Sequence, residues 1–180
     1  MNAIQTGELP LESLLRRHKA QGAFTDCYFI DVPGAIGHAR YVEAFYTSAV
    51  FKVERFILRW LARKPSSDRQ ARELAAGRRD RFAAWTVEAR ATDQLLMCDF
   101  MNRTRSWLMS VELPQTGGAT GTRLYFGSAV VPHQVSASGE GRLNWLFRSL
   151  MGFHEAYSKV LLWAAVARLK AIPHTPGDLA

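Results

Sequence analysis

The chain has 180 residues, of which 48% are hydrophobic and 22% are charged, and this composition excludes a low-complexity or largely disordered protein. The formal net charge of +7 is compatible with nucleic acid, an anionic membrane surface or an acidic ligand as a partner. A solvated basic surface is the simpler interpretation. Cys27 and Cys98 are too few for a disulfide framework, so we expect free thiols in a reducing cytoplasm.

The N-terminal segment is not expected to be a secretory signal. Basic residues come late in the N-terminal segment, and no apolar run precedes a signal-cleavage site. The longest apolar run, residues 160–167, is far shorter than the roughly 20 residues that cross a bilayer, so no transmembrane segment is predicted. No repeat or linker divides the chain. We therefore expect one domain over residues 23–171, between a partly flexible segment, residues 1–22, and a flexible tail, residues 172–180.

The first third of the domain predicts one strand and two helices. Residues 24–32 are rich in strand formers and end at a Pro-Gly pair. Residues 38–63 place their apolar side chains at steps of three and four, which predicts one helix with a broad apolar stripe. Ser67 and Gln70 have the spacing of a capping box and predict the start of a second, shorter helix.

The next part of the chain changes to a period of two. Apolar and polar side chains alternate in four segments, residues 85–89, 95–100, 106–113 and 123–131. Short connections between these segments indicate an antiparallel meander. The stretch 114–121, rich in Gly and Thr, is expected to be the loop of a hairpin, because it leads into a strand and lacks the following helix that a phosphate-binding loop requires.

A long helix is predicted over residues 142–170. It is apolar around much of its circumference, so it must be buried on more than one side. The predicted order is β-α-α-β-β-β-β-α. This order indicates an α+β fold in which an antiparallel sheet of about five strands wraps around the long C-terminal helix.

This order of elements, over residues 24–169, resembles the helix-grip fold of the START and Bet v 1-like (SRPBCC) superfamily, which includes polyketide cyclases. The resemblance implies a cavity between sheet and C-terminal helix that holds an apolar ligand. Residues 123–126, Arg-Leu-Tyr-Phe, and the pair Phe153 and His154 are also similar to DUF2867, a bacterial family of unknown function, although the stretch between them is longer here. That similarity implies a fold and no assigned reaction.

The cavity that the helix-grip resemblance implies has seven candidate lining residues: Trp85, Arg105, Trp107, Met109, Phe126, His154 and Tyr157. Arg105, placed near the mouth, could anchor a carboxylate or phosphate, and a structural ion pair with Asp99 is the alternative. His154 and Tyr157 could transfer protons, and a satisfied core histidine is the alternative for His154.

Other chemistry finds little support in the sequence. No His, Cys, Asp or Glu residues have the spacing of a zinc or iron site, and no cofactor is predicted. Nucleic acid is disfavoured as a partner, because the basic run 78–81 lacks exposed aromatic neighbours and any nucleic-acid-binding signature.

Three functions remain open. The favoured one is a binding protein for an apolar small molecule or lipid. The alternatives are a cyclase-like or isomerase-like enzyme that uses the same cavity, and a protein that uses a spare apolar helix face to form a homodimer or to meet a membrane surface.

Overall fold

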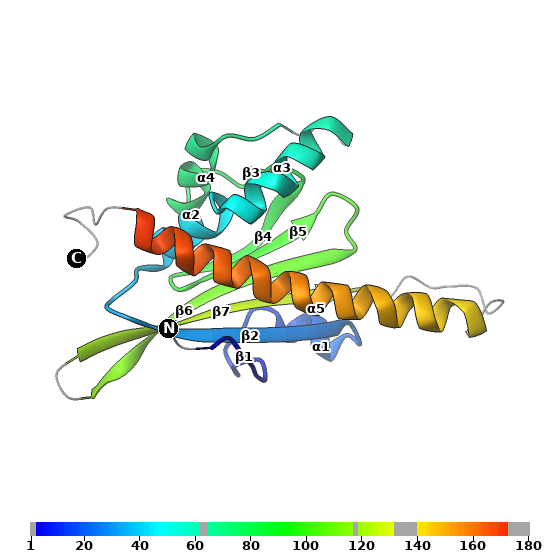
Figure 1. The fold of residues 1–180 in the computed structure, drawn as a ribbon, viewed down its shortest axis with the longest axis horizontal. Coiled ribbons are helices and arrows are strands. Elements are labelled where there is room, and N and C mark those ends of the chain that lie inside the picture. Colours follow the sequence, from blue (N-terminus) through cyan, green and yellow to red (C-terminus); the bar gives the residue numbers. More distant parts are fainter. Residues whose placement is uncertain (1–2, 62–64, 117–118, 132–139, 173–180) are drawn as a thin grey trace.

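The computed structural model describes the backbone of residues 3–61, 65–116, 119–131 and 140–172, and their side chains except those of 57–59, 61, 115–116, 119 and 140–154 (Figure 1). Its strands are β1 (Gln5–Thr6), β2 (Phe24–Pro33), β3 (Arg81–Phe82), β4 (Trp85–Ala91), β5 (Gln94–Asp99), β6 (Thr104–Thr116) and β7 (Ala119–Val130). Its helices are α1 (Arg16–Ala20), α2 (His38–Tyr46), α3 (Ala49–Leu61), α4 (Asp68–Ala75) and α5 (Glu140–Ala171). Residues 173–180 of the predicted tail lie outside the described residues.

All described strands form one antiparallel sheet of seven strands in the order β1-β2-β7-β6-β5-β4-β3. The predicted meander from β4 to β7 is confirmed, and β2 pairs with β7 at its far side. The sequence predicted about five strands because β1 and β3 have two residues each, too few to show a period. The predicted loop 114–121 was too long, since β6 continues to Thr116 and β7 begins at Ala119.

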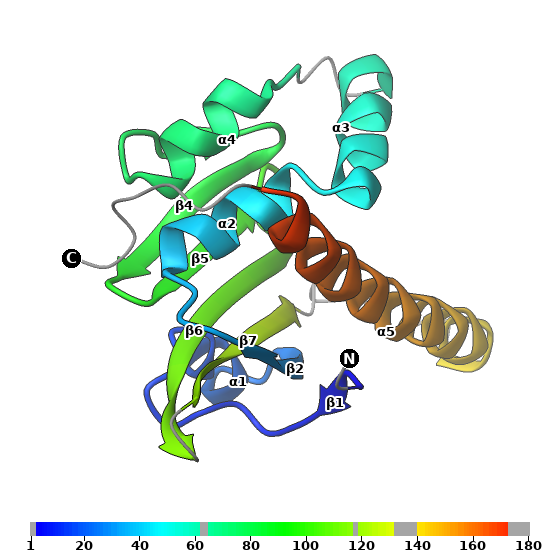
Figure 2. The ribbon, with the colours of Figure 1, turned by 60° about the vertical axis from the view of Figure 1, so that its left-hand side comes forward.

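The two faces of the sheet bury different segments of the chain (Figures 1 and 2). One face packs on α2, α3 and the C-terminal half of α5, through strand residues such as Ile30, Leu108 and Phe126. The opposite face packs on the N-terminal segment through Trp107 and Leu15, which are both fully buried. The sheet therefore lies between two apolar cores.

The C-terminal helix α5 is continuous, as the sequence predicted, but the sheet covers only part of it. Buried α5 residues of the main core are Leu161, Leu162, Ala165, Val166 and Leu169. The end of α5 that begins at Glu140 extends beyond the sheet in both views (Figures 1 and 2). Sheet and helix thus meet along the second half of α5.

The helix predicted over residues 38–63 is wrong in its continuity, because α2 ends at Tyr46 and α3 begins at Ala49. The two residues between them are buried. The Thr47 hydroxyl donates to the Glu43 carbonyl at 2.8 Å, and the Ser48 hydroxyl accepts from the Phe51 amide at 3.3 Å. Ser and Thr side chains that bond to the backbone compete with helix continuation, which accounts for the break. The predicted capping box of Ser67 and Gln70 at the start of α4 is confirmed.

A buried arginine connects α2 to the end of α5. Arg40 is 8% exposed, and one of its guanidinium nitrogens donates to the carbonyls of Leu169 at 3.3 Å and Ile172 at 2.9 Å. The last carbonyls of a helix lack partners within the helix and carry partial negative charge. Arg40 therefore caps α5 while it holds α2 beside it.

Replacing Arg40 by Ala is expected to lower the free energy of unfolding by about 2 kcal/mol, because charged hydrogen bonds to buried carbonyls are lost. Urea denaturation measures this change. Arg16→Ala, at an exposed position of α1, is the control and is expected to stay within about 0.5 kcal/mol of the parent protein. Equal effects of the two substitutions would show that Arg40 does not hold α5 in place.

Candidate functional site

A half-enclosed cavity of about 340 Å³ lies on the face of the sheet that carries α3 and α5. It is bordered by residues from both helices, from the end of α2 and from strands β4 to β7: Phe45, Phe51, Glu54, Trp85, Asp99, Thr104, Arg105, Ser106, Phe126, Ser128, Tyr157, Ser158 and Leu161. These elements are far apart in sequence, so the cavity depends on the tertiary fold as a whole. The helix-grip resemblance implies a cavity between sheet and C-terminal helix, and this cavity is also bordered by α2 and α3.

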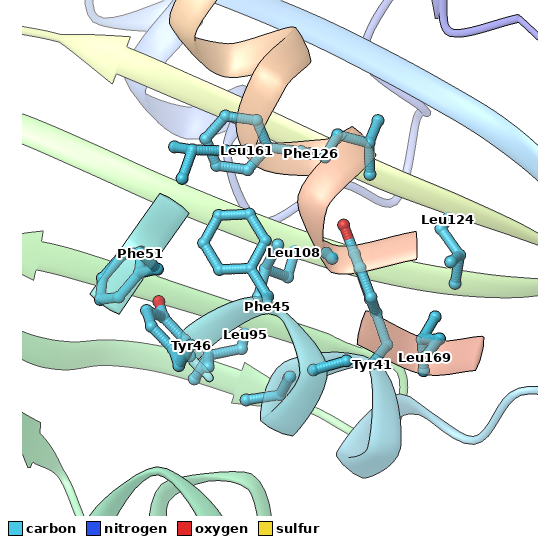
Figure 3. Close-up of a cluster of buried hydrophobic side chains, with 14 of the residues drawn as sticks. Tyr41, Phe45, Tyr46, Phe51, Leu95, Leu108, Leu124, Phe126, Leu161 and Leu169 are labelled. Atoms are coloured by element: carbon cyan, nitrogen blue, oxygen red, sulfur yellow. The ribbon is translucent and has the colours of Figure 1, made fainter. Parts of the chain in front are cut away.

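The inner wall of the cavity is aromatic. Phe45, Phe51, Phe126 and Leu161 come together from α2, α3, β7 and α5 (Figure 3). The Phe45 ring lies 5.1 Å from the Phe126 ring and 5.7 Å from the Phe51 ring, measured between centroids. Such a wall offers apolar contact and ring packing to a bound molecule.

Glu54 is an acidic residue at the border of the cavity. Its Oε2 accepts a hydrogen bond from the Tyr157 hydroxyl at 2.6 Å. Burial raises the pKa of Glu54, and hydrogen bonds from Tyr157 and Trp85 oppose that rise without cancelling it. Burial and the neighbouring carboxylate of Glu54 also raise the pKa of Tyr157. Glu54 and Tyr157 thus form a pair that can hold or exchange a proton.

Ser158 adds an unused polar group to the cavity border. Its side chain is 1% exposed, and its hydroxyl finds no hydrogen-bond partner among the residues that the structure describes. The nearby Ser128 hydroxyl, in contrast, donates to Asp26 at 2.7 Å. A buried hydroxyl without a partner costs stability, and a ligand with a polar group could satisfy it.

Three of the seven predicted lining residues border the cavity: Trp85, Phe126 and Tyr157. Phe126 belongs to the main core on this face of the sheet, and the other two side chains pack against that core. A fourth, Arg105, also borders the cavity, but its guanidinium group is bonded to other residues of the protein. The Arg105 guanidinium bonds to Glu88 at 2.9 Å and to the Asn102 carbonyl at 2.8 Å, so the expected ion pair exists with Glu88 in place of Asp99.

The remaining predicted lining residues fall elsewhere. Trp107 and Met109 are buried in the core on the opposite face of the sheet, so their assignment to the cavity was wrong. The sequence placed both residues on one face correctly, because their side chains share the period of two, but it chose the wrong face. His154 lies in α5, and its side chain is outside the described residues.

Sequence reasoning missed Glu54, because a charged residue in a helix with one broad apolar stripe is expected on the exposed side. A usable signal was present in its neighbours. Glu54 lies three residues after the large apolar Phe51, so the two share one face of α3. The structure buries Phe51, and Glu54 lies beside it at the cavity border.

Three further findings concern the thiols, possible metal ligands and the helices. Burial raises the pKa of the Cys27 thiol to about 12 and also raises that of Cys98, which disfavours the reactive thiolate in both. Within the described parts of the chain, no three His, Cys, Asp or Glu side chains gather as metal ligands. In the same parts, no helix combines the length and apolar character needed to span a membrane.

Comparisons with protein-family models, with curated proteins and with solved structures gave no match for this chain. What the site can do is therefore argued from its own geometry.

The raised pKa of Glu54 predicts a specific dependence of stability on pH. A carboxyl whose pKa is higher in the folded state favours folding when protonated, so its contribution is lost as pH rises through the folded pKa. Glu54→Gln, which keeps an acceptor for Tyr157, is expected to flatten that decline and to equal or exceed the parent protein in stability at the alkaline end.

Urea denaturation at a series of pH values from about 4 to 8 measures this dependence. Glu112→Gln, at an exposed position of β6, is the matched control and is expected to leave the curve unchanged. A parallel curve for Glu54→Gln would contradict a buried, proton-binding Glu54.

Proposed function

We propose that the chain binds a small, largely apolar molecule that carries one hydrogen-bonding group. The observation that carries the proposal is an aromatic cavity of about 340 Å³ with Glu54, Tyr157 and Ser158 at its border. Ligand sites combine apolar walls with a few polar groups that fix orientation, and they usually measure about 300–1,000 Å³.

The size of the cavity narrows the class of ligand. A volume near the lower limit of ligand sites suits a molecule of one or two rings or a short acyl chain, and a complete phospholipid would not fit. The rings of Phe45, Phe51 and Phe126 favour a flat or aromatic ligand, because offset and edge-on ring contacts add to apolar burial. The polar group of the ligand would accept from Ser158 or bond to the carboxyl of Glu54.

The proposal extends to the fold and the location of the protein. The antiparallel sheet, the order of elements and the contact of α5 with the sheet support a helix-grip architecture of the START and Bet v 1-like type. The free thiols of Cys27 and Cys98 support a reducing cytoplasm as the compartment.

The net charge of +7 is proposed to lie on the surface of the protein and to take no part in binding the cavity ligand.

Ligand binding is tested with native mass spectrometry of the purified protein and with titration of anilinonaphthalene sulfonate, an apolar fluorescent probe. Trp85→Leu removes ring surface from the cavity, and Ser158→Leu fills the cavity. Each is expected to raise the dissociation constant of the probe by about tenfold, which corresponds to about 1.4 kcal/mol.

The matched control for these variants is Trp163→Leu, since Trp163 is 53% exposed and lies outside the cavity border. Circular dichroism establishes that all variants fold. Equal probe affinity in the cavity variants and the control, together with no small molecule recovered from the purified protein, would remove the proposal.

A second candidate function is proton transfer on the bound molecule, as in an isomerase or cyclase. The specific observation in its favour is the Tyr157 hydroxyl at 2.6 Å from a Glu54 carboxyl whose pKa is raised, which suits a general acid or base. A ligand recovered from the protein would be incubated with it in heavy water. An enzyme is expected to exchange a carbon-bound hydrogen of the ligand for deuterium, and Glu54→Gln is expected to lose this exchange while it still binds the ligand. If the parent protein gives no exchange, the protein binds the molecule without transferring a proton.

A further inference from the structure

The described side chains of helix α3 form two apolar faces, and one of these faces packs within the molecule. Its inner face carries Phe51 and Glu54, which border the cavity. Its outer face carries Val53, Phe56 and Trp60, which are 60%, 63% and 68% exposed. The rings of Phe56 and Trp60 lie 6.1 Å apart, so these side chains form one continuous stripe. Steps of three and four residues place all three along one side of the helix.

The outer stripe is unusual for a helix on a protein surface. Single exposed apolar side chains are common, but clustered large ones mark a surface that meets a partner. Figure 2 shows α3 at the edge of the molecule, with its later turns directed away from the sheet. The stripe of Val53, Phe56 and Trp60, here called the outer stripe, is therefore accessible to a large, flat partner.

The charge around the outer stripe identifies the kind of partner. Within the helix itself, residues 49–61, the sequence contains three cations, Lys52, Arg55 and Arg59, and one acid. That acid, Glu54, faces the cavity on the inner side of α3. Lys52 and Arg55 share a single carboxylate, Asp68, so the segment keeps an excess of positive charge.

We infer that the outer stripe of α3 docks on the surface of an anionic phospholipid bilayer. A helix that lies in the bilayer interface has Trp, Phe and aliphatic residues on one side and Lys and Arg beside them. The apolar side chains would enter the boundary between head groups and acyl chains, and the cations would lie among anionic head groups. This inference goes beyond the cavity proposal and does not depend on a cavity ligand.

A second copy of the chain fits the outer stripe less well. Two identical surfaces that meet around a twofold axis would bring the same excess of cations together. Like charges at close range cost free energy, whereas an anionic lipid surface neutralises them. Charge complementarity thus favours a bilayer over a homodimer at this face.

The inference is tested by sedimenting the full chain with vesicles of phosphatidylcholine alone or mixed with phosphatidylglycerol. Binding is expected only to vesicles that contain phosphatidylglycerol and is expected to weaken as salt is added. The double variant Phe56→Ser and Trp60→Ser is expected to lower partitioning by about tenfold or more. The single variant Trp60→Ser gives an intermediate loss and a second readout if the double variant does not fold.

The matched control is Leu11→Ser, because Leu11 is 82% exposed but lies in the N-terminal segment on the other side of the sheet. It is expected to bind vesicles like the parent protein. No binding to anionic vesicles, or equal binding by the outer-stripe variants, overturns the inference. Sedimentation velocity tests the alternative of a homodimer. If the parent protein is a dimer, the double variant is a monomer and neither binds vesicles, the outer stripe binds a second copy of the chain. None of these outcomes depends on whether the cavity binds the fluorescent probe.

Discussion

The rings gathered at the break between α2 and α3 are the contact on which both the cavity and the exposed surface depend. In one continuous helix, Phe45 and Phe51 would project about 120° apart around the axis, about 9 Å apart along it, and their rings could not pack together. The break at Thr47 and Ser48 brings their ring centroids to 5.7 Å, and Tyr46 lies 4.8 Å from Phe51. Each such ring pair adds about 0.5–1.5 kcal/mol beyond apolar burial. The cluster therefore fixes where α3 leaves the sheet.

Glu54 lies on the cavity side of α3, where burial of its carboxylate costs free energy. A carboxylate removed from water needs hydrogen bonds or a proton. The cavity supplies donors from Tyr157 and Trp85, and among the described residues Glu54 forms no ion pair with a cation. Lys52 and Arg55, its neighbours in sequence, are paired with Asp68. The carboxyl thus remains available to a ligand, because neutralisation by a fixed cation would have tied it to the protein.

The sequence predicted those elements that are long enough for their apolar side chains to show a period. The C-terminal helix, the strands from β4 to β7 and the capping box at Ser67 all follow from local patterns. The seven-stranded count could not be predicted, because β1 and β3 are held by pairing with neighbours and not by composition. The break in the helix had a local signal, the adjacent Thr47 and Ser48, but the strong apolar stripe outweighed it.

The site was predicted in part for a related reason. On β6, Trp107 and Met109 form the heavier apolar face, so the pattern favoured that face for the cavity. The N-terminal segment covers it instead, with Leu15 fully buried and Gln94 accepting a hydrogen bond from the Trp107 indole at 2.9 Å. Which layer covers which face of a sheet is decided by tertiary contacts that a period of two does not contain.

Helix α3 joins the two proposals physically. Glu54 on its inner face and Val53 on its outer face are adjacent residues, and the outer ring of Phe56 is less than one turn from Glu54. A surface that orders this helix would also order one wall of the cavity. If a bilayer binds the outer stripe and a small molecule binds the cavity, linkage requires any effect of the bilayer on ligand affinity to be matched by an equal effect of the ligand on bilayer affinity. An apolar molecule is itself concentrated in a bilayer, so docking of α3 would bring the cavity close to the phase that holds the ligand.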